Sequence, residues 1–265
     1  MSTDTIKSVT FPNIVTGRLR VDPDGSDTTE FGVYSTGTVQ LYELGTRHED
    51  GDRSFRYAKA AAALSPQKGA QNNNTFFAEN TVATAAIGDM FVQITTDATS
   101  GNVTTGFGIK NNMVGGFFSQ PDATNRQWRR IVGHEAGPST ATIKVYLDGP
   151  ITRTMVTNSF CEWMHNPYIN LTNAGGTFVP VMGVPTTAIA SGSYGWVQTW
   201  GPCFVAQNAA ADFGGSYDQM AEWTEGGNIT DAGTNGNAQI AGYIMSKRNS
   251  GNWANPPFLF LTVTR

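Results

Sequence analysis

The segment of residues 179–205 constrains the fold of this chain more than any other part. It reads VPVMGVPTTAIASGSYGWVQTWGPCFV. Its first valines are bounded by Pro180 and Pro185, turn residues follow around Gly192, and an aromatic and β-branched run over residues 194–199 ends at a Gly-Pro pair. This order predicts a strand, a turn and a second strand, so we expect a β-hairpin here.

Two tryptophans, Trp196 and Trp200, lie four residues apart in the second predicted strand. In a regular strand, residues with this spacing share one face and sit about 13 Å from each other. Two flat aromatic side chains could stack on a sugar ring, but the neighbouring residues offer few polar groups to hydrogen-bond the sugar hydroxyls. Packing in the core or against another subunit is therefore the favoured interpretation.

The composition favours short strands joined by many turns. Of the 265 residues, 39% are hydrophobic, 14% are charged and 30 are glycine, whereas soluble domains usually carry about a quarter charged residues. So few charges suggest a surface that is largely covered by partners, although a neutral β protein with a free surface is the alternative. The net charge is −4, and the only cluster of basic residues in the sequence surrounds Trp128 and consists of Arg126, Arg129 and Arg130. Nucleic-acid binding requires a basic face, so direct binding of nucleic acid is not expected.

Cys161 and Cys203 form neither a disulfide framework nor a metal-binding pattern, and we expect two small buried residues. The N-terminal sequence lacks the apolar core of a signal peptide, and no apolar run reaches transmembrane length. The sequence therefore predicts a protein that is made in a cytoplasm and does not bind a membrane.

Residues 1–35 are predicted to form an extended arm with one or two short strands, because prolines and a polar acidic segment interrupt them. Residues 36–265 are predicted to form one β-rich domain, an antiparallel sandwich or barrel-like fold with long loops. It is all-β or carries one or two short helices, for which residues 58–63 and 218–225 are the candidates. Residues 206–239, rich in Gly and Asn but with aromatic side chains, are predicted to be an insertion that serves an interface.

We expect roughly ten to fourteen strands, paired mostly in antiparallel fashion because the connections are too short for crossover helices. The last strand is apolar on both faces, so both faces must be covered. Beyond the hairpin, the strands predicted from alternation and turn signals are residues 38–44, 55–59, 91–95, 106–110, 116–119, 127–132, 142–147, 240–245 and 258–264.

The sequence contains no recognisable catalytic pattern. His48, His134 and His165 lie in unrelated settings without the spacing of metal ligands. An acid–base pair of His134 and Glu135 is disfavoured, because adjacent strand residues point to opposite faces. A nucleophile elbow, a phosphate-binding loop and a dinucleotide fingerprint are all missing from the sequence. A carboxylate pair for sugar hydrolysis stays open, with Asp148, Glu162, Asp218 and Glu222 as the pool, but nothing in the sequence selects among them. We therefore predict no catalytic residue, no cofactor and no metal, and a protein that is not an enzyme.

Large apolar side chains in the arm, the hairpin, the insertion and the last strand are the candidate interface residues. They are Phe11, Ile14, Trp196, Trp200, Phe213, Tyr217, Trp223, Phe258 and Phe260.

Several phrases of the chain resemble virion structural proteins of tailed bacteriophages. They are RRIVGHEAGPSTATIKVYLDGPI at residues 129–151, HNPYINL at residues 165–171, and VMGVPTTAIASGSYGWVQTWGPC at residues 181–203. The last phrase is similar to a motif of the head-decoration, or capsid cement, class, as are FRYAKA at residues 55–60 and ALSP at residues 63–66. The residues that carry the clearest motif are Gly183, Val184, Pro185, Gly192, Tyr194, Gly195, Val197, Gln198, Gly201 and Pro202.

The resemblance implies a non-enzymatic protein that binds the outer surface of a phage capsid and stabilises the shell. Its partners would be the major capsid protein and further copies of itself, as a trimer, in a virion assembled in a bacterial cytoplasm. One alternative is a tail or fibre-base protein or a minor capsid subunit, which a low copy number per particle would indicate. A further alternative is a carbohydrate-binding module that uses Trp223, with Tyr217, Asp218 and Glu222 close by in the sequence.

Overall fold

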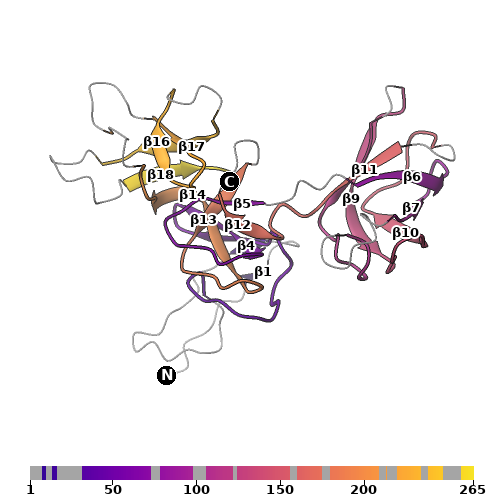
Figure 1. Cartoon of the computed structure of the whole chain (residues 1–265), viewed down its shortest axis with the longest axis horizontal. Coiled ribbons are helices and arrows are strands. Elements are labelled where there is room, and N and C mark those ends of the chain that lie inside the picture. The colour runs from indigo at the N-terminus through magenta and orange to yellow at the C-terminus, as the bar shows by residue number, and fades with distance from the viewer. Residues whose placement is uncertain are drawn as a thin grey trace. The chain divides into compact units, whose positions relative to one another are not determined.

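The chain folds into two compact units. The computed structural model (Figure 1) divides it into unit 1, Met1–Asn73 and Tyr168–Arg265, and unit 2, Asn74–Pro167. The prediction of one β-rich domain over residues 36–265 did not include this division. The residues that the structure describes are 8–9, 14–16, 32–72, 78–97, 106–121, 124–155, 160–174, 180–208, 213, 220–233, 238–246 and 258–265.

Unit 1 is built on one twelve-stranded sheet. Its main path runs β1-β2-β3-β4-β14-β18-β17-β15-β16, with β13 paired to both β14 and β5, and β12 paired to β5. All pairs are antiparallel except β2 with β3. The strands are β1 (Ser8–Val9), β2 (Ile14–Thr16), β3 (Arg47–Asp50), β4 (Arg53–Lys59), β5 (Ala70–Asn72), β12 (Leu171–Asn173), β13 (Val181–Pro185), β14 (Tyr194–Phe204), β15 (Met220–Trp223), β16 (Ile229–Asp231), β17 (Ile240–Ile244) and β18 (Phe258–Thr262).

The predicted hairpin is confirmed. β13 pairs with β14 through Val184 opposite Gln198 and Pro185 opposite Val197. At the turn, Gly192 has a φ of 78°, which a glycine adopts without strain, and the Ser193 N–H donates to Ala190 O at 3.0 Å. β14 then lies between β4 and β18, so the hairpin supplies a central strand of the sheet.

The two tryptophans of this strand do not share a face, because β14 contains a bulge. Trp196 lies opposite Tyr57 of β4, but the register shifts after Gln198, and Trp200 lies opposite Ser54. One extra residue in a strand turns every later side chain to the other side. Trp196 is 1% exposed among Phe55 and Tyr57, whereas Trp200 is half-buried on the opposite face. The expectation that both tryptophans face the same way is wrong.

Unit 2 is a closed six-stranded barrel with the strand order β10-β7-β6-β11-β8-β9, and all its pairs are antiparallel. It leaves unit 1 after β5 and returns before β12, and these two strands pair with each other. Unit 2 is thus inserted at one end of a pair of neighbouring strands. Its strands are β6 (Ala78–Thr84), β7 (Phe91–Thr95), β8 (Phe117–Gln120), β9 (Gln127–His134), β10 (Thr142–Leu147) and β11 (Phe160–Met164).

The described residues contain no helix, so both helix predictions are wrong. In the first candidate, Ala58 lies in β4 opposite Gly195, and the backbone N–H groups of Ala60 and Ala61 donate to Ser193 O and Leu171 O. In the second candidate, Met220–Trp223 forms β15. Pairing with neighbouring strands outweighs the helix propensity of alanine, since intrinsic propensity is a weak preference. The all-β expectation is confirmed.

Two of the predicted strands are irregular. Residues 106–110 form turns, and residues 38–44 form a loop. This loop is held by side-chain contacts and not by the backbone hydrogen bonds of a β-ladder. Tyr42 contacts the rings of Tyr57 and Trp196 at 5.2 and 5.4 Å, while Val39 and Leu41 remain exposed. In the arm, β1 and β2 agree with the expectation of one or two short strands.

Candidate interaction surface

Four adjacent strands of unit 1 carry large apolar side chains on one face, here called the aromatic face. The register sets Pro202 of β14 opposite Phe260 of β18, Phe260 opposite Tyr243 of β17, and Tyr243 opposite Met220 of β15. Side chains that are opposite each other in an antiparallel pair lie on the same side of the sheet. The members of the aromatic face are Trp200, Pro202, Phe204, Met220, Tyr243, Met245, Phe258 and Phe260.

The rings of this face contact one another across the strands. The centroids of Phe204 and Phe258 are 4.7 Å apart, those of Tyr243 and Phe260 are stacked at 5.0 Å, and those of Trp200 and Phe260 are 5.5 Å apart. Much of this surface is nevertheless open, since Phe204 is 51% exposed and Tyr243 is 46% exposed. None of the members carries a charge. Four strands at a spacing of about 4.8 Å make the face about 14 Å across.

The opposite side of the same strands is the core of unit 1's C-terminal part. Leu259 and Leu261 of β18 alternate with the two phenylalanines and are fully buried beside Ala221, Trp223 and Ala241. The predicted last strand is therefore apolar on both faces, as expected. Its inner face is covered by the chain itself, and its outer face belongs to the aromatic face.

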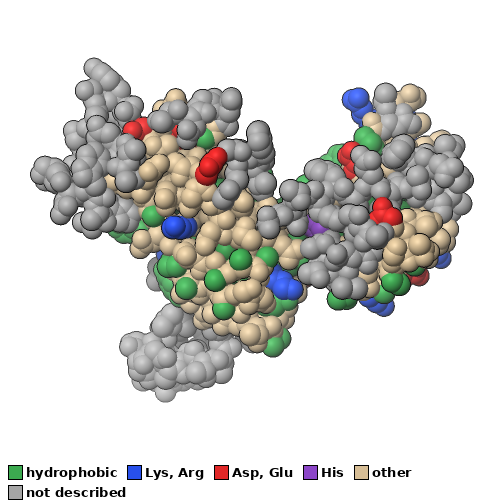
Figure 2. All heavy atoms as spheres, in the orientation of Figure 1, with side chains coloured by type: hydrophobic (Ala, Val, Ile, Leu, Met, Phe, Trp, Pro, Cys, Tyr) green, Lys and Arg blue, Asp and Glu red, His purple; other side chains and the backbone are tan. Residues whose placement is uncertain are grey.

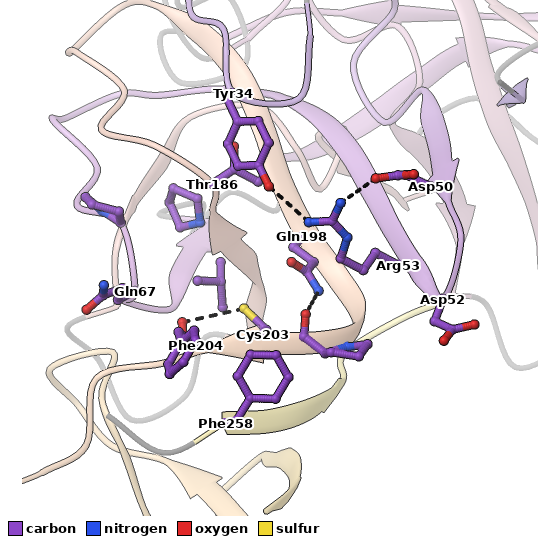
Figure 3. Close-up of a pocket in the computed structure, with 14 residues that line it drawn as sticks. Tyr34, Asp50, Asp52, Arg53, Gln67, Thr186, Gln198, Cys203, Phe204 and Phe258 are labelled. Atoms are coloured by element: carbon purple, nitrogen blue, oxygen red, sulfur yellow. Dashed lines mark hydrogen bonds and ion pairs between the residues drawn. The ribbon is translucent and has the colours of Figure 1, made fainter. Parts of the chain in front are cut away.

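A pocket with a volume of about 540 Å³ lies beside the aromatic face and includes Phe204 and Phe258 in its lining. Figure 3 shows these two rings at one end and Arg53 at the other, with Cys203 and Gln198 between them. Arg53 donates to Tyr34 Oη at 3.0 Å and forms an ion pair with Asp50. The cation is thus held by residues of its own unit.

The groups in this pocket do not form a catalytic arrangement. Burial raises the pKa of the Cys203 thiol to about 12, although the charge of Arg53 acts in the opposite direction. The thiol is therefore neutral at physiological pH and is a poor nucleophile. The Gln198 side chain donates to Trp200 O at 3.0 Å and to Pro202 O at 2.8 Å, so it holds the backbone around the bulge.

His134 also has a structural place in unit 2. Its Nε2 accepts a hydrogen bond from the Met113 N–H at 3.0 Å, and its Nδ1 lies 2.7 Å from Glu135 O. Burial lowers the pKa of His134, although the Glu135 carbonyl acts in the opposite direction, so the neutral ring bridges two backbone groups. The Glu135 carboxylate instead accepts from the Lys144 N–H. Cys161 and Cys203 are both buried thiols, as predicted.

The structure brings three of the predicted interface residues together on the aromatic face, namely Trp200, Phe258 and Phe260. Two others are core residues, because Trp196 is 1% exposed and Trp223 is 5% exposed. A sugar platform built on Trp223 is thereby overturned, since its ring is packed inside the core.

Of the remaining candidates, Phe213 packs partly buried against the core that contains Trp223. Ile14 lies in β2 opposite Arg47, and its side chain, like Phe11 and Tyr217, lies outside the described residues. The prediction missed Phe204 and Tyr243. Phe204 could have been found from the period of two that it shares with Pro202 in the same strand.

No protein-family model matches the chain, and no curated protein or solved structure matches it. Over the residues that the structure describes, no group of His, Cys, Asp and Glu side chains could hold a metal ion. The same part of the chain contains no helix of the length and apolarity needed to cross a membrane.

Proposed function

We propose that this chain is a virion structural protein of the head-decoration class, which binds the outer surface of a phage capsid and stabilises the shell. The observation that carries the proposal is the aromatic face, an uncharged surface of ring and thioether side chains that a single copy leaves open to solvent. The resemblance of residues 181–203 to the decoration class supplies the setting.

The aromatic face is assigned to a second copy of this chain. Interfaces of permanent oligomers resemble a domain core and exclude charged residues, whereas transient contacts are more polar. The largest apolar patch on a monomer usually measures some 300–600 Å² and is often functional. A face of this composition therefore fits a contact between subunits that stay together.

The low charge of the chain supports the same role. In Figure 2, charged side chains are sparse among the described atoms, which are mostly tan and green. Only two ion pairs, Arg47–Glu49 and Arg53–Asp50, occur within the described ranges. Contacts made by backbone and small polar groups avoid the entropy cost of ordering long charged side chains. Many such weak contacts, repeated by symmetry, bind a shell firmly.

Removing the two most exposed rings of the aromatic face should dissociate the oligomer. We expect the double variant Phe204→Thr with Tyr243→Thr to weaken self-association roughly hundredfold, because aromatic side chains that become buried in an interface contribute much of its energy. Threonine keeps the preference for strand structure. The measurement is the mass of the full chain by analytical ultracentrifugation over a range of concentrations.

The matched control for this experiment is Tyr146→Thr, which removes another exposed tyrosine from a strand, in unit 2. It should leave the mass unchanged. An oligomer that survives the double variant, or a wild-type chain that is a monomer at every concentration, would contradict the assignment of this face.

The contact with the shell is assigned to the arm. Deleting residues 1–30 should leave a folded oligomer that no longer loads onto purified capsids that lack this protein, which sedimentation of the mixture measures. The copy number per particle separates the proposal from its alternative: many copies, in multiples set by the shell's symmetry, fit decoration, and a dozen or fewer fit a tail protein. Loading that is unchanged by the deletion would remove the arm from the proposal.

A further inference from the structure

The outer surface of the unit 2 barrel presents one tryptophan to solvent. Trp128, in β9, is 65% exposed, which is more than any other ring among the described residues. It lies directly opposite Ser119 of β8, and Ser119 lies opposite Glu162 of β11. These side chains share one side of three adjacent strands, and together with Phe117 they are here called the Trp128 platform.

The platform combines an aromatic surface with hydrogen-bonding groups. The Phe117 ring meets Trp128 edge to face, with centroids 6.1 Å apart, so Phe117 supports the indole from the side. The Ser119 hydroxyl donates to Glu162 Oε2 at 3.3 Å, and this carboxylate forms no ion pair with a residue that the structure describes. Acceptor and donor capacity therefore remains at the edge of the exposed ring.

The basic residues around Trp128 do not make this surface an anion site. The Arg129 guanidinium is held by backbone, because it donates to Pro150 O at 2.7 and 3.0 Å and to Trp128 O at 2.7 Å. Arg130 lies on the platform's side of β9, opposite Phe117. Glu162 lies on the same side, and the Asp148 carboxylate accepts a hydrogen bond from the Arg130 N–H at 3.0 Å. Carboxylates therefore accompany the one cation of this surface, which disfavours an anionic ligand.

We propose that the Trp128 platform binds a glycan by stacking a pyranose ring on the indole. A sugar ring with mostly equatorial hydroxyls has a face of C–H groups and a rim of hydroxyls. The exposed indole matches that face, and Ser119, Glu162 and Arg130 offer acceptors and donors to the rim. This proposal is independent of the capsid role, because it concerns a different unit and a different ligand.

The Trp128 platform differs from the aromatic face because it carries polar and charged side chains, which a sugar site needs and a permanent subunit contact excludes. The aromatic face is continuous and uncharged, whereas Trp128 has both apolar neighbours, Phe117 and Met164, and the polar side chains of Ser119, Glu162 and Arg130 on its side of the strands. It is also held on strands of a closed barrel, so the groups are positioned before the ligand arrives. A second protein would leave Glu162 and Arg130 to be desolvated, which is costly without partners.

The experiment begins with the full chain displayed on beads, so that many weak sites act together on a glycan array. The best glycan is then titrated in solution against the free protein by calorimetry. We expect Trp128→Ala to weaken binding tenfold or more, since loss of a central aromatic contact has effects of about this size. Trp128→Phe should retain part of the affinity, and Glu162→Ala should weaken it several-fold.

The control is Tyr146→Ala, which removes another exposed ring from the same barrel and should leave glycan binding unchanged. A wild-type chain that retains no glycan overturns the proposal. So does glycan binding that persists in Trp128→Ala. If this variant instead changes only the mass of the oligomer or its loading onto capsids, the platform is a protein contact, and the glycan assignment is wrong.

Discussion

Replacing Trp196 with alanine should lower the free energy of unfolding of unit 1 by about 3–5 kcal/mol, the usual cost of truncating a fully buried aromatic side chain. Trp196 is 1% exposed, and its ring lies 5.3 Å from that of Tyr57 and 5.4 Å from that of Tyr42. Truncation would leave a cavity between the sheet and the loop of residues 38–44, because Tyr42 packs on the same ring. Urea unfolding followed by circular dichroism measures the cost.

Trp200→Ala is the matched control, since it removes the same side chain from the same strand four residues away. Trp200 is half-buried and packs against Phe260 on the outer side of the sheet. Its removal should cost less than about 2 kcal/mol, within the range of ordinary substitutions, and should also weaken self-association. Equal losses of stability from both substitutions would contradict the opposite orientation of the two tryptophans.

This pair of residues shows how far the sequence alone could be interpreted. The hairpin was predictable because its signals are local: valines next to prolines, a glycine turn and a β-branched run. The bulge after Gln198 was not, because it arises where β14 pairs with β4 on one side and β18 on the other. Pairing between distant strands has no signature in a short window of sequence.

The insertion of unit 2 was missed for a similar reason. The strands on either side of it, β5 and β12, have three residues each, too few to stand out by alternation. Leu171 pairs with Asn72, although the entire sequence of unit 2 separates these two residues along the chain. Nothing in the composition near either residue indicates its partner. In unit 2, strands β7, β8, β9 and β10 were predicted, β7 and β10 with the expected bounds, because alternation along one strand is a local property. Strands β6 and β11 were missed.

The candidate surface was predictable only in part. Phe258 and Phe260 were found because an apolar final strand needs cover on both faces. Their neighbours Phe204 and Tyr243 join them only through the register of β14 and β17 with β18. Trp223 was chosen for its polar surroundings in sequence, but β15 turns it into the core, and the most exposed ring of the described chain, Trp128, lies in the other unit.

Replacing Trp163 with alanine should destabilise unit 2 and leave unit 1 intact. Trp163 is fully buried at the centre of the barrel, with its ring 5.0 Å from Phe118 and 5.2 Å from Phe107. We expect a loss of about 3–5 kcal/mol, which is a large share of the 5–15 kcal/mol that stabilises a typical domain. The midpoint of thermal unfolding of unit 2 should fall by more than about 12 °C.

The loss of stability in Trp163→Ala should be confined to unit 2, because the two units have separate hydrophobic cores. The cluster around Trp163 contains residues of unit 2 alone, and the clusters around Trp196 and Trp223 contain residues of unit 1 alone. A cooperative unit is one that shares a core, so each unit should unfold by itself. Hydrogen exchange measured by mass spectrometry should show lost protection in strands β6 to β11 and retained protection in β4, β14 and β18.

Trp128→Ala provides the control within the same barrel, because it removes an exposed tryptophan from β9 without opening the core. Its cost should stay within about 0.5 kcal/mol, as for most surface substitutions. If Trp163→Ala instead removes protection from unit 1 to the same extent, the two units form one cooperative structure. In that case the glycan platform and the aromatic face could not be altered independently, and variants of one would have to be tested for loss of the other.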